Sequence, residues 1–435
     1  SGGMTAFGEP LAIEPHPIVQ LDPIFGVDNP TLYQTYTSGG GLVTTGDATY
    51  LVSCSNTAYS YGVVRSRRFL RYHPGQGAVG RFACMFDTPK TNTTQQGGLF
   101  NQENGFMIGY NGTKFGVLHR RGYKAAIYKI TLNSFTGSQT VTVTLGGLTK
   151  TISILNTDTI YTAANKIGEA ITHDTLPWLA EDKDNTVELL HNGTGAVSGT
   201  FSITSNGNLS ATITQVRAGA VGTETWYYVS PELGDNGING TCSIDPTKFN
   251  VYQIDYRWLG AGRIQFLYED PITSNFVVLH TIHWVNAHNV PHVDNPSMKI
   301  GFVAYNTGGT NSVTLTGCSL YMANQGILGK NEYTRSATVT KTSITKDTLA
   351  HIISIHNPVI WKNKINTREV IMQDLTVACQ STDPLEMHFF IDAALDTGTQ
   401  DFRSQINQPV TISTADGVIS LANNAPLVSY TIGIN

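Results

Sequence analysis

Apolar and polar residues alternate with a period of two along most of the chain, which is the pattern of half-buried β-strands. The run QTVTVTLGGLTKTISIL at 139–155 shows it most clearly, and its Gly-Gly pair supplies the backbone freedom that a tight hairpin turn needs. The run GFMIGYNGTKFGVLHR at 105–120 predicts a second hairpin, which turns at an Asn-Gly pair. A mainly β chain is therefore expected.

One segment has helical periodicity instead. In TDTIYTAANKIGEAITH the apolar residues recur at steps of three and four, and Thr157 or Thr159 is available to cap the N-terminus. The segment lies between the 139–155 hairpin and further strands. We interpret residues 124–222 as a small α+β domain inserted at a hairpin tip of a larger sandwich, because surface loops tolerate such insertions.

The remaining strands divide the chain further. Residues 1–123 and 223–326 share an aromatic-rich, strand-rich character and are predicted to form one discontinuous sandwich. A polar stretch follows, and residues 331–435 return to β-branched strands, which predicts a C-terminal β-sandwich of the usual size. In VYQIDYRWLG the alternate aromatic residues, Tyr252, Tyr256 and Trp258, are expected to face the core, with the intervening residues facing solvent.

Composition narrows the partners. Charged residues make up 14% of the chain and the net charge is −5, so the overall charge gives no attraction to nucleic acid or to an anionic membrane. No stretch approaches the roughly 18–20 apolar residues of a membrane helix. The five cysteines are too widely spaced for a CxxC motif, which favours buried free thiols.

A histidine-rich segment, LHTIHWVNAHNVPHVDNP at 279–296, holds the first candidate site. Imidazoles and a carboxylate at such spacing can ligate a transition metal. The two prolines indicate a long loop, however, so solvated loop histidines are favoured and neither a metal nor another cofactor is predicted. The tryptophan in this loop is the best candidate for stacking on a sugar ring. The candidate ligand-binding residues are Trp284, His283, His288, His292 and Asp294.

An arginine-rich segment, RSRRFLR at 65–71, holds the second candidate site. Arg65, Arg67, Arg68 and Arg71 fall within seven residues, and neither alternating face of the segment is purely apolar. Basic residues at a sheet edge discourage aggregation, and arginine is enriched at interfaces, where its planar fork pairs with carboxylates. An anion site remains the alternative, but no aromatic platform for nucleic acid accompanies it. We favour arginines at a sheet edge or a subunit interface.

No catalytic signature is present. The sequence holds no G-x-S-x-G elbow, H-E-x-x-H, P-loop, G-x-G-x-x-G or kinase motif. The neighbouring Glu269 and Asp270 would face opposite sides of a strand, so they cannot act as a glycosidase pair. Glu232 and Asp235 lie in a Gly-rich loop and are interpreted as turn carboxylates. The chain is therefore predicted not to be an enzyme.

Several segments resemble those of virion structural proteins of tailed phages and large DNA viruses. They are YGVVRSRRFLRYHPGQGAVGRFACMFD, NGFMIGYNGTKFGVLHRRG, DPTKFNVYQIDYRWLGAGRIQFLYED and NPSMKIGFVAYNTGGTNSVTLTGCSLYMANQG. The resemblance implies a concanavalin-like or laminin-G-like jelly-roll core, with an insertion similar to small domains of phage tail proteins. It implies a structural role for the arginines and supplies neither a catalytic residue nor a metal site.

The resemblance implies a component of the virion exterior, such as a spike, fibre, tail or vertex protein. Its expected partners are other copies of itself, as a trimer by analogy with viral fibres, other virion proteins and host-surface glycans. A stand-alone carbohydrate-binding protein is the first alternative, and a polysaccharide hydrolase or lyase is the second.

Overall fold

The computed structural model describes residues 15–172, 177–229, 244–326 and 336–370 apart from 343, 346 and 347, with short segments beyond 370. The chain divides into two compact units. One comprises residues 1–124 and 220–332, and the other comprises residues 125–219 and 333–435.

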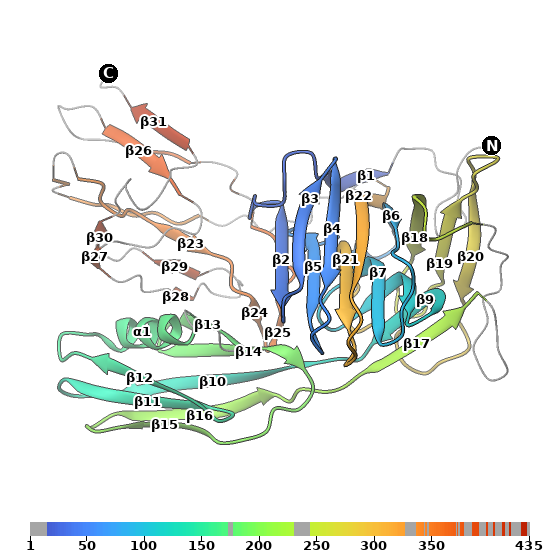
Figure 1. The fold of residues 1–435 in the computed structure, drawn as a ribbon. Helices are drawn as coiled ribbons and strands as arrows, with labels where there is room; N and C mark the ends of the chain where they lie inside the picture. Colours follow the sequence, from blue (N-terminus) through green and yellow to red (C-terminus); the bar gives the residue numbers. More distant parts are fainter. Residues whose placement is uncertain are drawn as a thin grey trace. The chain divides into compact units, whose positions relative to one another are not determined.

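The first unit is a sandwich of two antiparallel sheets (Figure 1). One sheet has seven strands in the order β17-β9-β8-β7-β21-β5-β2. Its strands are β2 (Tyr33–Ser38), β5 (Tyr61–Ser66), β7 (Thr93–Phe100), β8 (Gly105–Asn111), β9 (Lys114–Arg121), β17 (Thr223–Tyr228) and β21 (Lys299–Asn306).

The other sheet has eight strands, with the path β20-β19-β18-β6-β22-β4-β3 and β1 added beside β22. Its strands are β1 (His16–Leu21), β3 (Leu42–Gly46), β4 (Thr49–Cys54), β6 (Gly77–Met85), β18 (Asn250–Tyr256), β19 (Ile264–Glu269), β20 (Phe276–Ile282) and β22 (Val313–Gln325). The chain crosses repeatedly between the sheets, from β4 to β5, β6 and β7 in turn. This arrangement confirms the predicted mainly β class and the jelly-roll sandwich.

Alternation along the strands fills the space between the sheets. Tyr252, Ile254 and Tyr256 of β18 are fully buried, as predicted, and Trp258 packs against the same core. The opposite side of β18 differs from the prediction, because Gln253 is only 7% exposed instead of facing solvent. The Gln253 side-chain amide donates to both carboxylate oxygens of Asp255, at 2.9 Å each.

Both predicted hairpins are confirmed. β8 and β9 pair from Gly105 to Asn111, and β11 (Gln139–Leu145) pairs with β12 (Leu148–Ile154) through a turn at Gly146 and Gly147, which have φ angles of 63° and 98°. Positive φ angles at both turn positions are the geometry that favours glycine there.

In the second unit, the described residues of 125–219, which exclude 173–176, form two small sheets and one helix. The sheets have the orders β13-β14-β10-β16 and β12-β11-β15. The elements are β10 (Ala125–Ser134), β11 (Gln139–Leu145), β12 (Leu148–Ile154), α1 (Ile160–Thr172), β13 (Trp178–Lys183), β14 (Thr186–Thr194), β15 (Phe201–Ser205) and β16 (Ser210–Arg217).

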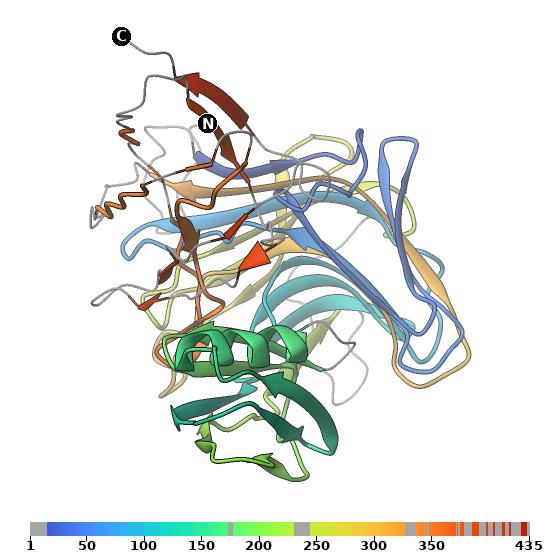
Figure 2. The same cartoon turned by 90° about the vertical axis from the view of Figure 1, so that its left-hand side faces the viewer.

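The predicted helix is confirmed and lies against strands of its own unit (Figure 2). Thr159 caps it, because its hydroxyl accepts a hydrogen bond of 3.1 Å from the Thr162 amide. Ala163, Ala164, Ile167 and Ile171 are fully buried. The apolar face that the periodicity predicted is therefore the face that packs.

The C-terminal segment contributes to the second unit as well. Ile360, at 2% exposed, packs with Ala125, Ile127 and Leu190 on the side of β10 that faces away from the main core of this unit. The Val359 amide donates to the Glu181 carboxylate at 2.7 Å. The first four residues of β10 are thus apolar on both faces because both faces are covered there.

The strands of this segment are short. They are β23 (Ser354–His356), β24 (Ile360–Trp361), β25 (Lys364–Ile365), β26 (Leu385–Phe389), β27 (Thr397–Gly398), β28 (Arg403–Ser404), β29 (Thr411–Ser413), β30 (Gly417–Val418) and β31 (Val428–Ile432). Much of the C-terminal β-sandwich predicted for residues 331–435 falls outside the described residues, so the three-domain division stays a prediction.

Of the cysteines, Cys54 and Cys84 are buried free thiols, as predicted, and Cys318 is a free, half-buried thiol. Cys242 and Cys379 lie outside the described residues. No helix in the described part of the chain has the length and apolar character that crossing a membrane requires.

Candidate ligand-binding face

The outer face of the seven-stranded sheet is fixed by alternation. Met107 of β8 lies between Phe106 and Ile108, which belong to the sandwich core, so Met107 points outward. It packs in a small outer cluster that includes Val63 of β5 and Val303 of β21. Along β5, β8 and β21, every second residue counted from Val63, Met107 or Val303 therefore faces outward.

Three tyrosines lie on this outer face at the β2 end of the sheet. Tyr36 pairs with Val63, and Tyr61 pairs with Tyr305, so all three point to the same side. Tyr36 is 44% exposed, and Tyr61 and Tyr305 are half-buried. We call Gln34, Tyr36, Tyr61, Arg65 and Tyr305 the tyrosine face.

Hydrogen bonds tie three side chains of this face together. Arg65 donates through Nε to the Gln34 side-chain oxygen at 3.2 Å and through a terminal nitrogen to the Tyr36 hydroxyl at 3.2 Å. Its guanidinium also lies 5.0 Å from the centre of the Tyr36 ring. The arginine is therefore positioned in advance beside an exposed aromatic ring.

Lys299 of β21 places a buried amine beside this face. Lys299 is 4% exposed, and its amine donates to the same Gln34 oxygen at 2.6 Å and lies 4.4 Å from the centre of the Phe69 ring. Burial, with Arg65 and Arg67 nearby, lowers the pKa of Lys299 to about 6. At neutral pH the Lys299 amine is therefore mostly uncharged, which removes its repulsion from the two arginines.

A surface pocket of about 380 Å³ opens at the same edge. It is lined by Val27, Asp28, Pro30, Tyr33, Gln34, Thr35, Tyr36, Val43 and Arg67. Two of the predicted arginines, Arg65 and Arg67, thus lie at a site that combines a pocket, an aromatic ring and a buried amine. Arg68 faces elsewhere and donates to the Ile18 carbonyl of β1 at 3.2 Å. Arg71 is half-buried, and its own carbonyl accepts from Asn324 at 3.1 Å.

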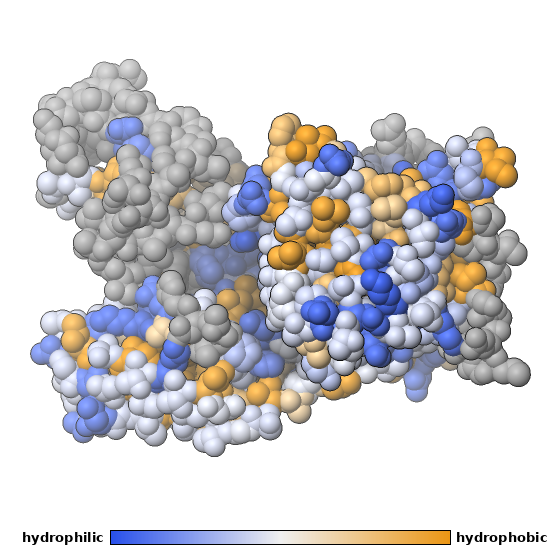
Figure 3. Space-filling model, viewed as in Figure 1, coloured by the Kyte–Doolittle hydropathy of each residue, from blue (hydrophilic) through white to orange (hydrophobic). Residues whose placement is uncertain are grey.

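The surface in view in Figure 3 carries small hydrophobic patches separated by polar ones on the sandwich. On that side, the described residues form no continuous apolar area of the kind that marks an obligate interface. The interface role of the four arginines stays a prediction.

The second predicted site, in the histidine-rich segment, is folded against the sandwich core. Trp284 is only 4% exposed, and its indole nitrogen donates to the Val290 carbonyl at 2.6 Å. His288 stacks on the indole with ring centres 3.7 Å apart. In this conformation the indole offers little area for a sugar ring, and its ligand-binding role stays a prediction.

The interpretation of solvated histidines holds for part of this segment. His283 and His288 are exposed, but His280 and His292 are buried at 5% and 0% exposed, so for them it is wrong. Their burial lowers the pKa of both to about 4, which keeps them neutral at physiological pH. Asp294 is exposed at the end of the segment.

The structure brings part of the predicted set together, because the rings of His288 and His292 both lie against Trp284, with centres 3.7 Å and 6.2 Å from it. His283 and Trp284 line a pocket of about 320 Å³ with Arg257, Arg263 and Val285, and the other three predicted residues do not line it. Within the described ranges, no group of three or more His, Cys, Asp or Glu side chains is arranged to hold a metal ion.

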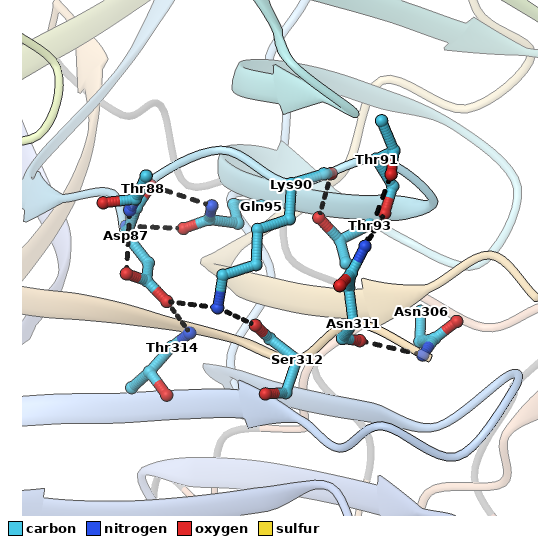
Figure 4. A network of polar contacts seen from close by, with 10 residues as sticks. All are labelled: Asp87, Thr88, Lys90, Thr91, Thr93, Gln95, Asn306, Asn311, Ser312 and Thr314. Atoms are coloured by element: carbon cyan, nitrogen blue, oxygen red, sulfur yellow. Dashed lines mark hydrogen bonds and ion pairs between the residues drawn. The ribbon is translucent and has the colours of Figure 1, made fainter. Parts of the chain in front are cut away.

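A polar network ties the loops at one end of the sandwich together (Figure 4). The Asn306 amide donates to three backbone carbonyls, of Ser55, Gly309 and Asn311, at 2.9–3.1 Å, and its oxygen accepts from two backbone amides. Asn311 in turn donates to the Thr91 carbonyl at 2.9 Å. Because Asn306 uses its whole hydrogen-bonding capacity on backbone groups, we assign it a structural role.

Sequence reasoning missed Gln34, Tyr36, Tyr61, Lys299 and Tyr305. A signal exists in KIGFVAYN, where Lys299 and Tyr305 alternate with the fully buried Ile300 and Phe302. That alternation separates the faces, but it does not show which strands are neighbours. The tyrosine face requires β2, β5 and β21 side by side, and β21 is far from the other two in sequence.

Comparison with solved structures finds weak likenesses. The carbohydrate recognition domain of Emp47p matches with 8% identity over 69% of this chain and 93% of that chain, at a TM-score of 0.29. A β-1,3-glucanase from Mycobacterium marinum matches with 9% identity over 71% and 99%, at 0.30. Arcelin-5, a lectin-like defense protein from Phaseolus vulgaris, matches with 8% identity over 70% and 97%, at 0.27. Likenesses at these scores assign neither a site nor an activity to this chain.

No protein-family model matches the sequence, and no curated protein matches it either.

Proposed function

We propose that the chain is a glycan-binding protein and that the tyrosine face binds the glycan. The observation that carries the proposal is the placement of Tyr36, Tyr61 and Tyr305 on one register-fixed face with Gln34 and Arg65. Aromatic rings offer flat apolar area to the C–H faces of a sugar, while amide and guanidinium groups offer directional hydrogen bonds to its hydroxyls. The prearranged Arg65–Tyr36 contact lowers the entropy cost of binding.

A glycan-array screen followed by calorimetry with the strongest ligand tests the proposal. Tyr36→Ala should weaken binding about tenfold, which corresponds to a loss of about 1.4 kcal/mol. Phe249→Ala is a matched control, because Phe249 is a similarly exposed aromatic residue, at 49%, that precedes β18 of the other sheet. Tyr36→Phe separates the ring from its hydroxyl.

Two results would contradict the proposal. One is the absence of binding to any glycan of a broad array. The other is an equal loss of affinity in the Tyr36→Ala and Phe249→Ala variants.

We further propose that this binding serves attachment of a virion to its host and takes place without catalysis. The resemblance of the quoted segments to virion structural proteins supports the first part. Mass spectrometry of purified virions should detect the chain, and solution mass measurement should show a multimer; absence from particles would contradict the proposal. Release of new reducing or unsaturated sugar ends from a bound polysaccharide would show that the chain is an enzyme.

A further inference from the structure

Lys299 and Gln34 bring an amine and a carboxamide together on the outer side of the seven-stranded sheet. The Lys299 nitrogen donates to the Gln34 side-chain oxygen at 2.6 Å, although the two residues are 265 positions apart in sequence. Arg65 donates through Nε to the same oxygen at 3.2 Å. An atom that accepts from two donors is the carbonyl oxygen of the carboxamide, not its nitrogen. The amine therefore lies beside a carbonyl group that a guanidinium polarises.

Burial leaves this amine without a proton at neutral pH. Lys299 is 4% exposed, and its nitrogen lies 4.4 Å from the centre of the Phe69 ring. Burial first, and then the charges of Arg65 and Arg67, lower the pKa of the amine to about 6. Asp28, the carboxylate in the pocket that Gln34 lines, is solvent-exposed. A neutral lysine amine is the nucleophilic form of this side chain.

We propose that Lys299 and Gln34 react to form an intramolecular isopeptide bond. The Lys299 nitrogen attacks Cδ of Gln34, and Arg65 stabilises the negative charge that develops on the carbonyl oxygen. The bond from Cδ to Nε2 then breaks, and a proton of the amine passes to the departing nitrogen. That nitrogen leaves as ammonia through the open pocket that Gln34 lines. The reaction consumes no oxidant, cofactor or second molecule.

The bond would fasten a strand at the end of its sheet. β2 is the last strand of the seven-stranded sheet, next to β5, whereas β21 lies inside the sheet between β7 and β5. A covalent tie between residues this far apart in sequence also restricts the unfolded chain. The product keeps the Gln34 carbonyl group beside Arg65, so the cross-link is compatible with the tyrosine face and does not depend on glycan binding.

Intact mass spectrometry of the folded full chain tests the proposal. The measured mass should lie below that of the sequence by the mass of one ammonia, about 17 Da. A succinimide at an Asn-Gly pair such as Asn111-Gly112 removes the same mass. The protein is therefore first incubated in mild alkali, which hydrolyses succinimides and leaves isopeptide bonds intact. Tandem mass spectrometry of a digest should then find the Gln34 peptide joined to the Lys299 peptide.

Lys299→Met and Gln34→Leu should each abolish the mass loss. Gln253→Leu is the matched control and should keep it, because Gln253 also accepts from an arginine Nε, that of Arg81, but its amide contacts a carboxylate instead of a lysine. Arg65→Gln should slow the reaction at least tenfold at pH 8, since it removes the donor that faces the developing charge.

The pH profile of the reaction separates a reacting amine from a structural one. Chain recovered unfolded from inclusion bodies and refolded at pH 5 should cross-link about tenfold more slowly than at pH 8, because about a tenth of the amine is neutral one pH unit below its pKa. The cross-linked form no longer titrates at Lys299. The pH dependence of stability that this amine causes therefore belongs to the unreacted chain.

Two results would overturn the proposal. One is a folded parent chain that keeps the full mass of its sequence after prolonged incubation at pH 8. The other is a mass loss that persists in Lys299→Met or disappears in mild alkali. Because the first result needs no variant, a variant that fails to fold leaves the test intact.

Discussion

Phe302 of β21 provides a quantitative test of how the two sheets meet. Its ring points across the sandwich at Gly317 of β22, and a Cβ added at Gly317 would lie 2.6 Å from Cζ of that ring. The ring also packs edge-on against Phe82 of β6, with centres 5.9 Å apart. Gly317 is therefore small because a phenylalanine from the facing sheet occupies its side-chain space.

The expected free energies follow from that contact. Gly317→Ala should destabilise the sandwich by about 2 kcal/mol, since overpacking costs more than the methyl group gains in backbone entropy. Phe302→Leu should cost about 1.5 kcal/mol through lost burial. In the double variant the alanine methyl enters space that the ring has left, so the total should be about 2 kcal/mol below the sum.

A double-mutant cycle, measured by urea unfolding of the full chain, gives these values. The unfolding transition to analyse is the one whose midpoint Phe302→Leu shifts. Gly46→Ala is the control, because the added methyl would meet only Leu51, at 3.7 Å, and the backbone there needs no positive φ. It should change stability by less than about 0.5 kcal/mol. Additivity of the two changes within about 0.5 kcal/mol would refute this packing of the sheets.

Three further predictions concern single groups. The pKa of the free Lys299 amine is lowered in the folded state, so the unfolded state binds more protons between pH 6 and pH 10. The free energy of unfolding should therefore rise with pH across that window, by up to about 1.4 kcal/mol per pH unit. This slope should vanish in Lys299→Met, and an unchanged slope in unfolding titrations would contradict the burial of this amine. Thr159→Ala should cost about 1 kcal/mol and speed hydrogen exchange at the Thr162 amide, whereas unaltered exchange would exclude the cap. Asn306→Asp should lower stability at pH 7 by about 3 kcal/mol, because the new carboxylate faces three carbonyls. The melting temperature of the variant should recover in part at pH 4, where the protonated carboxyl group can donate a hydrogen bond again. Equal melting temperatures of the variant and the parent protein at pH 7 would rule out this network.

The sequence was sufficient for features set by local geometry. The Gly146-Gly147 turn and a threonine cap follow from which residues tolerate positive φ or accept an amide hydrogen bond, although the sequence left Thr157 and Thr159 as candidates and the structure selects Thr159. The core face of β18 also follows from alternation. The hydrophobic period of a strand or helix and the geometry of a single turn are enough to determine these parts of the fold.

The candidate site was not predictable in the same way. Arg65 was identified, but its contacts with Gln34 and Tyr36 arise because β5 pairs with β2, and Lys299 reaches them because β21 pairs with β5 from the other side. His292 illustrates the opposite difficulty. It lies in a segment with proline and polar residues, yet it is fully buried because that segment packs on the sandwich core.

The chain leaves the sandwich after β9 and returns at β17, its direct partner, and the amides and carbonyls of Lys124 and Ala220 pair across the gap at 2.9 Å each. A short peptide could therefore span this point without disturbing the ladder. This makes the junction a place to exchange residues 125–219 for another domain while β9 and β17 keep their register, and such an exchange would uncover Ile360, which packs on β10.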